Sequence, residues 1–193
     1  MREEIRTERL VLRQLTLDDA SAISKLGSDK DISRMTGSFP HPFPLLSAEF
    51  KIMHMKAQNR RGLAYPYAIT IDGGELMGIC DLFRRSADAV LEIGYWLGKP
   101  YWGKGYSTEA AIALMKEARD SLGVSSLIAG VFSDNPASIR VLQKLGFKLT
   151  GEEEMYFSIG RMEKAHSLSL RLDFEAPQRA APLRSNLQFV KTA

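Results

Sequence analysis

The chain has 193 residues, of which 45% are hydrophobic and 25% charged, a composition typical of folded globular proteins. Its single cysteine, Cys80, excludes an internal disulfide, and no apolar run approaches the roughly 18 residues that a membrane helix requires. Three of the 26 basic residues and none of the 23 acidic ones lie in 176–193, so the rest of the chain is neutral. These features predict a cytoplasmic enzyme or binding protein and argue against nucleic acid or a membrane as partner.

The first half of the chain predicts an opening strand, three helices and the start of an antiparallel meander. The expected elements are a strand at 9–15, helices at 18–27, 29–35 and 46–61, and strands at 66–71 and 75–83 joined by an Asp-Gly-Gly turn. Between the second and third helices, residues 39–44 hold three prolines, which exclude a helix and a central strand. Such a rigid aromatic-proline loop is a candidate border for a binding site.

The second half alternates strands with helices. The expected elements are a strand at 89–97, a helix at 107–122, a strand at 125–132, a helix at 136–145 and strands at 147–150 and 162–174. A meander followed by this alternation predicts one α/β (α+β) domain over 1–175, with a mixed, mostly antiparallel sheet of about seven strands and helices on both faces. Residues 176–193 are expected to be a basic, loosely ordered extension.

A glycine-rich segment at 95–110 carries the densest functional signal. Here a strand ends, glycines follow at 98, 103 and 105, and a strong helix begins. Glycines let the backbone approach a ligand closely, and the free N–H groups at a helix start attract phosphate oxygens. A Walker A loop fails because Gly105 replaces the Ser or Thr that binds magnesium, and a dinucleotide turn fails because Thr108 replaces the third glycine. A plain turn without a ligand is the remaining alternative.

Four blocks of sequence resemble the GCN5-related N-acetyltransferases (GNAT), and within them the ribosomal-protein N-terminal acetyltransferases of RimJ/RimL type. The blocks are TERLVLRQLTLDDA, EIGYWLGKPYWGKGYSTEA, DNPASIRVLQKLGFK and the closing SLRLDF, and they span about residues 7–174. The resemblance implies a GNAT-like fold and acetyl-coenzyme A as the donor. It also implies that the turn residues Trp102, Gly103, Lys104, Gly105, Tyr106 and Ser107 hold its diphosphate, while Tyr95, Trp96 and Leu97 pair with its pantetheine arm.

Acetyl transfer to an amine also needs a base and a proton for the leaving thiolate. Glu92 is the candidate base, although an edge carboxylate without a catalytic role is an equal interpretation. The family's usual tyrosine is absent, because the seventh residue after Asn135 is Leu142. RimL-like members place a serine three residues after this Asn. The resemblance therefore implies that Ser138 donates a hydrogen bond or a proton to the sulfur of coenzyme A. Asn135 itself either binds the pantetheine or caps the following helix.

The acceptor is expected to be a primary amine, either a protein N-terminus or a small molecule, attacked directly in a ternary complex. Phe39 and Pro40 are weak candidates for the acceptor pocket. The three histidines lack the spacing of metal ligands, so no metal is expected. The resemblance allows a monomer or a homodimer. A non-catalytic module that binds or senses acyl-coenzyme A is the alternative function, and a magnesium-dependent nucleotide-binding protein is a third.

Overall fold

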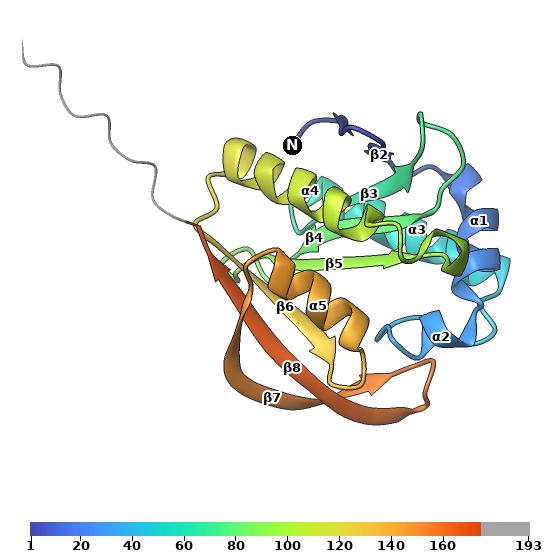
Figure 1. The fold of residues 1–193 in the computed structure, drawn as a ribbon. Coiled ribbons are helices and arrows are strands. Elements are labelled where there is room, and N and C mark those ends of the chain that lie inside the picture. The colour runs from blue at the N-terminus through green and yellow to red at the C-terminus, as the bar shows by residue number, and fades with distance from the viewer. Residues whose placement is uncertain (175–193) are drawn as a thin grey trace, which may run out of the picture.

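A computed structural model describes residues 1–174 of the chain (Figure 1). Its strands are β1 Glu4–Arg6, β2 Val11–Gln14, β3 Ala64–Thr70, β4 Gly78–Phe83, β5 Glu92–Leu97, β6 Ser126–Phe132, β7 Lys148–Ser158 and β8 Glu163–Asp173. They form one sheet in the order β1-β2-β3-β4-β5-β6-β8-β7, antiparallel throughout except for the pair β5 and β6. The expected extension at 176–193 lies outside the described residues.

Helices cover both faces of this sheet (Figure 1). They are η1 Leu17–Asp19, α1 Ala20–Gly27, α2 Lys30–Ser33, α3 Leu45–Arg60, η2 Lys99–Tyr101, α4 Tyr106–Leu122 and α5 Pro136–Lys144. The apolar stripe of α4 is buried against one face, and Gly123 ends this helix in the left-handed conformation, as its sequence predicts. Within residues 1–174 no helix combines the length and apolarity needed to cross a membrane.

Alternation along β5 divides the core into two clusters. Ile93 and Leu97 belong to the cluster under α4 and α5, whereas Trp96 packs with the cluster under α1 and α3. Because successive strand residues point to opposite faces, Glu92 and Gly94 share the α3 side with Trp96.

The described part of the sheet has eight strands where the sequence predicted about seven. The additional strand is β1, which has three residues with a single buried side chain and so carries almost no hydrophobic pattern. The predicted strand at 147–150 extends to Ser158 as β7, whose side chains are exposed at all but the last position. An exposed edge strand lacks the alternation from which strands are predicted. The predicted strand at 89–97 begins later, at Glu92.

Candidate active site

The glycine-rich turn places unpaired backbone N–H groups at the start of α4. Gly103 and Gly105 have φ of 72° and 80°, a region that side chains disfavour, and a Cβ on Gly103 would meet nothing within 4 Å. Among residues 1–174, no backbone carbonyl accepts a hydrogen bond from the N–H groups of residues 103–105. At the start of α4, Glu109 N donates to Gly105 O. This is the arrangement that binds phosphate oxygens.

Three contacts hold the turn in this shape. The indole Nε1 of Trp102 donates to Leu97 O at 2.7 Å, which anchors the turn to the end of β5. The Arg9 guanidinium donates to Lys104 O at 3.0 Å and lies 4.8 Å from the centroid of the Tyr106 ring. Sequence reasoning missed Arg9 because it lies 95 residues before the turn it contacts. Its positive charge adds to the attraction of this turn for an anion.

The edge of β5 that faces β6 has backbone groups free for pairing. The two strands share one register pair, Glu92 with Ile128, and then diverge toward their C-terminal ends (Figure 1). Ile128 N donates to Leu91 O, so the odd-numbered residues of β5 direct their backbone groups toward β6. The N–H and C=O of Tyr95 therefore face the widening side. An extended chain with amide groups can pair there as an added strand.

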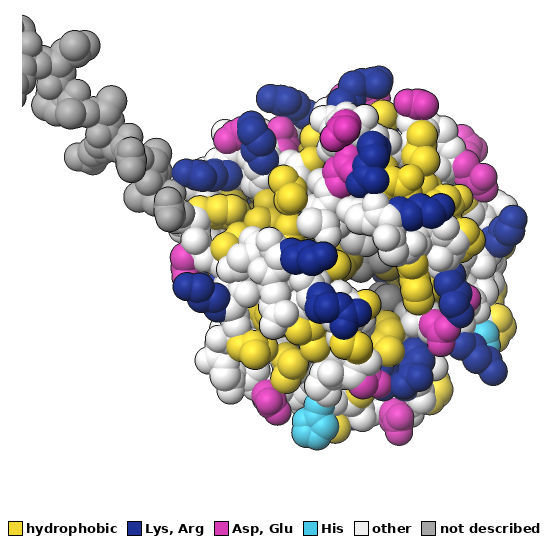
Figure 2. All heavy atoms as spheres, viewed as in Figure 1, with side chains coloured by type: hydrophobic (Ala, Val, Ile, Leu, Met, Phe, Trp, Pro, Cys, Tyr) yellow, Lys and Arg dark blue, Asp and Glu magenta, His cyan; other side chains and the backbone are white. Residues whose placement is uncertain are grey.

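Figure 2 shows a hollow near the middle of the face covered by α4 and α5, with Lys and Arg side chains around it. The ends of β5 and β6 and the first turns of both helices meet in this region (Figure 1). The candidate donor site therefore combines the turn's unpaired N–H groups, the free edge of β5 and a basic rim.

Ser138 and Tyr95 come together on this side of the sheet. The Tyr95 hydroxyl and Ser138 Oγ are 2.9 Å apart, within hydrogen-bond distance. Asn135 Oδ1 accepts from Ser138 N at 3.1 Å, so the capping interpretation of Asn135 is the one observed. Leu142, where many family members have a tyrosine, is buried. Tyr95 thus brings a phenol to Ser138 from a strand, which sequence spacing along α5 could not reveal.

Glu92 lies on the α3 side at the point where β5 and β6 are still paired. Its Oε1 accepts from Gly130 N on β6 at 3.3 Å. Burial raises the pKa of Glu92, and the bond from Gly130 opposes this increase. Asp81 on β4 lies on the same face, opposite Gly94, and was not singled out from the sequence. Nothing in its surrounding residues, CDLF, distinguishes it from an ordinary strand carboxylate.

The Phe39 loop borders this second face. Phe39 is only 2% exposed. Its ring packs edge-on against Trp96 and in a tilted arrangement against Phe43. Pro40 is half-buried beside it. Phe39 therefore forms part of the core beneath the α3 side and offers almost no surface to an acceptor. Within residues 1–174, no group of three or more His, Cys, Asp or Glu is arranged to hold a metal ion.

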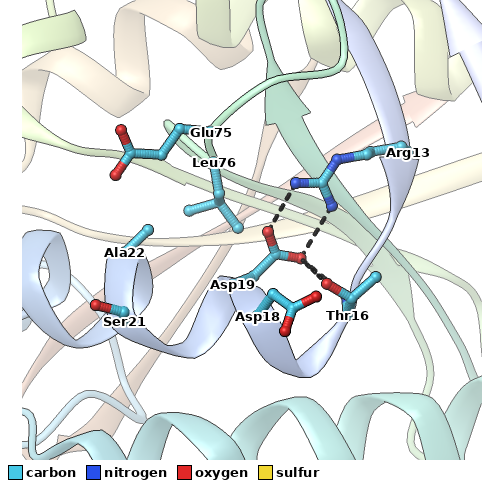
Figure 3. Close-up of a pocket in the computed structure, with 8 residues that line it drawn as sticks. All are labelled: Arg13, Thr16, Asp18, Asp19, Ser21, Ala22, Glu75 and Leu76. Carbon is cyan, nitrogen blue, oxygen red and sulfur yellow. Dashed lines mark hydrogen bonds and ion pairs between the residues drawn. The ribbon is translucent and has the colours of Figure 1, made fainter.

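A recess of about 400 Å³ lies elsewhere, between the end of β2, the start of α1 and residues 75–76 (Figure 3). Two of its charged side chains, Arg13 and Asp19, pair with each other. Arg13 donates to both carboxylate oxygens of Asp19, at 2.7 and 3.0 Å, and Thr16 N donates to Asp19 Oδ2 at 2.8 Å. Because Asp19 is 4% exposed, this group stabilises the entry into α1 and does not offer a free charge to a ligand.

The family model of the acetyltransferase (GNAT) domain matches residues 9–148, which include β5, the glycine-rich turn and α5. The chain belongs to the GNAT acetyltransferase family. It is an N-acetyltransferase that uses acetyl-coenzyme A, and the unpaired N–H groups of its turn fit the diphosphate of that donor.

Several relatives resemble this acetyltransferase. It is 30% identical over 151 residues to the uncharacterized N-acetyltransferase p20 of Bacillus licheniformis, covering 77% of this chain and 84% of the relative. It is also 30% identical over 122 residues to the L-methionine sulfoximine/L-methionine sulfone acetyltransferase of Salmonella typhimurium. This match covers 61% of this chain and 71% of the relative. A solved ribosomal-protein alpha-N-acetyltransferase, RimL in complex with coenzyme A, has the same fold, with a TM-score of 0.77 and 20% sequence identity. The match covers 91% of this chain and 100% of the RimL chain.

Proposed function

We propose that this acetyltransferase transfers the acetyl group to a primary amine, at a protein N-terminus or on a small molecule, by direct attack while both substrates are bound. The observation that carries the proposal is the turn before α4 with its unpaired N–H groups, next to the free edge of β5. A covalent intermediate on Cys80 is disfavoured because the thiol is fully buried and burial raises its pKa well above the ordinary value.

In this proposal the donor is held by two sets of groups. The turn residues Trp102, Gly103, Lys104, Gly105, Tyr106 and Ser107 surround its diphosphate, and Arg9 adds charge from outside the turn. The backbone of Tyr95, Trp96 and Leu97 pairs with its pantetheine arm, with Tyr95 offering both N–H and C=O. Asn135 contributes by capping α5, which fixes Ser138 near the sulfur, and does not need to touch the donor itself.

The chemistry requires a neutral amine, a donor to the developing oxyanion and a proton for the thiolate. We assign the oxyanion to a backbone N–H in the segment Tyr95–Leu97 and the thiolate proton to the Ser138 hydroxyl. The Tyr95 phenol supports this assignment because it can replenish the proton on Ser138. A coenzyme A thiol with a pKa near 8.5 leaves without complete protonation, so Ser138 assists and is not indispensable.

Glu92 is the base candidate derived from the sequence. Ser138 also supports placement in the RimJ/RimL-type subgroup.

The test is calorimetric titration with acetyl-coenzyme A, followed by thiol release with peptides and small amines. We expect wild type to bind with micromolar affinity, and Gly105→Leu to reduce the affinity at least 50-fold, because a side chain at φ 80° distorts the turn. Gly123→Leu is the matched control, since it places the same side chain in the same left-handed region at the other end of α4. Equal affinity in both variants would contradict the assigned donor site.

Thiol release separates the enzyme from the non-catalytic alternative. An acetyltransferase releases coenzyme A in proportion to the acetylated amine, whereas a sensing module binds the donor without turnover. Mass spectrometry of the acceptor identifies the acetylated nitrogen. Absence of donor binding in wild type would reject the proposed function altogether.

A further inference from the structure

Asp81 lies on the face of the sheet opposite α4 and α5, next to the proposed reacting centre. Three cross-strand pairs share this face, Ile79 with Trp96, Asp81 with Gly94 and Phe83 with Glu92. Gly94 precedes Tyr95, the residue whose backbone faces the diverging edge of β5. A donor bound along that edge therefore brings its thioester close to the backbone that Asp81 overlies. A nucleophile can approach from the α3 side because α4 and α5 cover the other.

Gly94 is required for this placement of the carboxylate. A Cβ at Gly94 would lie 2.7 Å from Asp81 Oδ1 and 3.2 Å from the Phe83 ring. Such an approach is closer than van der Waals contact allows, so any other residue at 94 would displace the carboxylate or the ring. The glycine thus permits a carboxylate to lie directly over the central strand of the active site.

The Asp81 carboxylate has no partner within residues 1–174. It makes no ion pair, and no other described residue donates a hydrogen bond to it. Lys51 on α3 attracts it electrostatically, but the Lys51 ammonium donates to Ser38 Oγ at 3.0 Å and lies over the Phe39 ring at 5.0 Å. A partly buried carboxylate without a hydrogen-bond donor destabilises the fold and indicates a functional group.

A second unpaired group lies on the same face, two residues from Gly94. The indole Nε1 of Trp96 is buried and has no hydrogen-bond partner among the described residues. Buried N–H groups are nearly always paired, so this donor is a second unsatisfied polar group on the face that carries Asp81.

We propose that Asp81 receives the acceptor's α-amino group and takes its proton, so that the neutral nitrogen attacks the thioester carbonyl. This inference rests on the proposed function. A C–N bond forms and the C–S bond breaks, with its electron pair leaving on sulfur. The ammonium nitrogen loses two protons in total. One passes to Asp81 and then to water, and the second is balanced by the proton that the leaving thiolate takes up.

The titration of Asp81 supports this role. Burial raises its pKa to about 7, Lys51 opposes the increase and Glu92 adds to it. An α-amine has a pKa near 8, so passing its proton to Asp81 is unfavourable by only about tenfold. A lysine side chain, with a pKa near 10.4, would face a penalty of more than about 1000-fold. The site therefore favours α-amines of amino acids or peptides over lysine side chains.

The experiment measures kcat/KM against pH with three probes: L-methioninamide, a peptide with a free N-terminus and Nα-acetyl-lysine methylamide. We expect acetylation of at least one α-amine, at least 100-fold more efficient than the lysine probe. Asp81→Asn should lower kcat/KM at least 100-fold, while acetyl-coenzyme A still binds. The fall in rate toward low pH should move from about pH 7 to about pH 8, where the free α-amine itself titrates. Glu92→Gln should cause a smaller loss, because in this proposal Glu92 raises the pKa of Asp81 and does not itself take the proton of the amine. Asp88→Asn, in the exposed turn between β4 and β5, is the matched control and should match wild type.

Each contrary result has a distinct meaning. Equal kcat/KM in wild type and Asp81→Asn would overturn the role of Asp81, as would an unchanged acid limb in the variant. Donor binding without acetylation of either α-amine would overturn the assigned acceptor class. Loss of donor binding in wild type would instead reject the proposed function. The relative rates of the amide and the peptide tell a small-molecule acceptor from a protein N-terminus.

Discussion

Asp81 illustrates how one residue can oppose folding while serving a site. Its pKa in the folded state, about 7, lies above the ordinary aspartate value because burial disfavours the charged form. Between about pH 4 and pH 7 the folded chain therefore binds more protons at this position than the unfolded chain. Stability accordingly falls as pH rises through this interval and stays lowered above it.

Asp81→Asn should therefore stabilise the protein at neutral and alkaline pH. We expect the free energy of unfolding to increase by about 1–2 kcal/mol at pH 8 and to change little at pH 4. The shift of about three pKa units sets an upper bound near 4 kcal/mol, which the partial exposure of the carboxylate reduces. Urea denaturation of both proteins at the two pH values measures the difference. A variant less stable than wild type at pH 8 would contradict the assigned burial penalty.

Among the elements, α4 depends on a distant segment for the position of its first turn. Glu109 accepts from Thr7 Oγ1 at 2.6 Å, from Arg9 N at 3.0 Å and from Arg9 Nε at 2.7 Å. The carboxylate at the start of a helix also interacts favourably with the helix dipole. Because Arg9 in turn contacts Lys104 O, Glu109 connects the segment between β1 and β2 to the donor turn.

Glu109→Gln should weaken this connection with little change of shape. We expect a loss of about 1–2 kcal/mol in the free energy of unfolding, because hydrogen bonds to a charged group are lost. Affinity for acetyl-coenzyme A should fall several-fold, since Arg9 is no longer held at the turn. Asp120→Asn on the same helix is the control: its pair with Lys116 is exposed, so less than about 0.5 kcal/mol is expected. Thermal denaturation and calorimetry make the comparison, and equal losses would contradict the connection.

At the scale of the whole molecule, one arginine joins three segments that are distant in sequence. Arg161 donates to both oxygens of Asp134 at 2.8 and 2.9 Å and to Arg34 O at 2.6 Å. Asp134 directly precedes Asn135, and Arg161 lies in the turn between β7 and β8. Nearby, Ile159 N donates to Gly37 O at 3.0 Å. The β7–β8 turn thereby fixes the segment that leads to Phe39.

Arg161→Lys should make residues 34–39 more mobile while keeping the positive charge at position 161. An ammonium group cannot make the paired contacts of a guanidinium, so we expect amides in 34–39 to exchange hydrogen at least tenfold faster. KM for the acceptor should rise more than KM for acetyl-coenzyme A. Arg171→Lys, in an exposed pair with Asp173, should leave both unchanged. Hydrogen-exchange mass spectrometry and steady-state kinetics test this, and unaltered exchange in 34–39 would rule out the fixing role.

The sequence by itself determined the mixed sheet, its covering helices and the turn before α4. These features follow from periodicity and from glycine, proline and capping residues, which act within a few positions of the chain. The sequence also indicates the family, because the blocks that carry the resemblance are local. The roles of Glu92 and Ser138 remain predictions. Asn135 caps α5, as one of its two interpretations predicts, and its contact with the pantetheine arm stays a prediction.

Only the tertiary structure decided which distant residues meet at the site. Arg9 reaches the turn, Tyr95 supplies a phenol to Ser138, and Asp81 lies over Gly94, each through strand pairing or helix packing between segments far apart in sequence. Local patterns carry no information about register between such segments, because the side-chain spacing along a strand is the same for every partner. Burial, and with it the pKa of Asp81, is likewise set by the surrounding elements and not by neighbours in the chain.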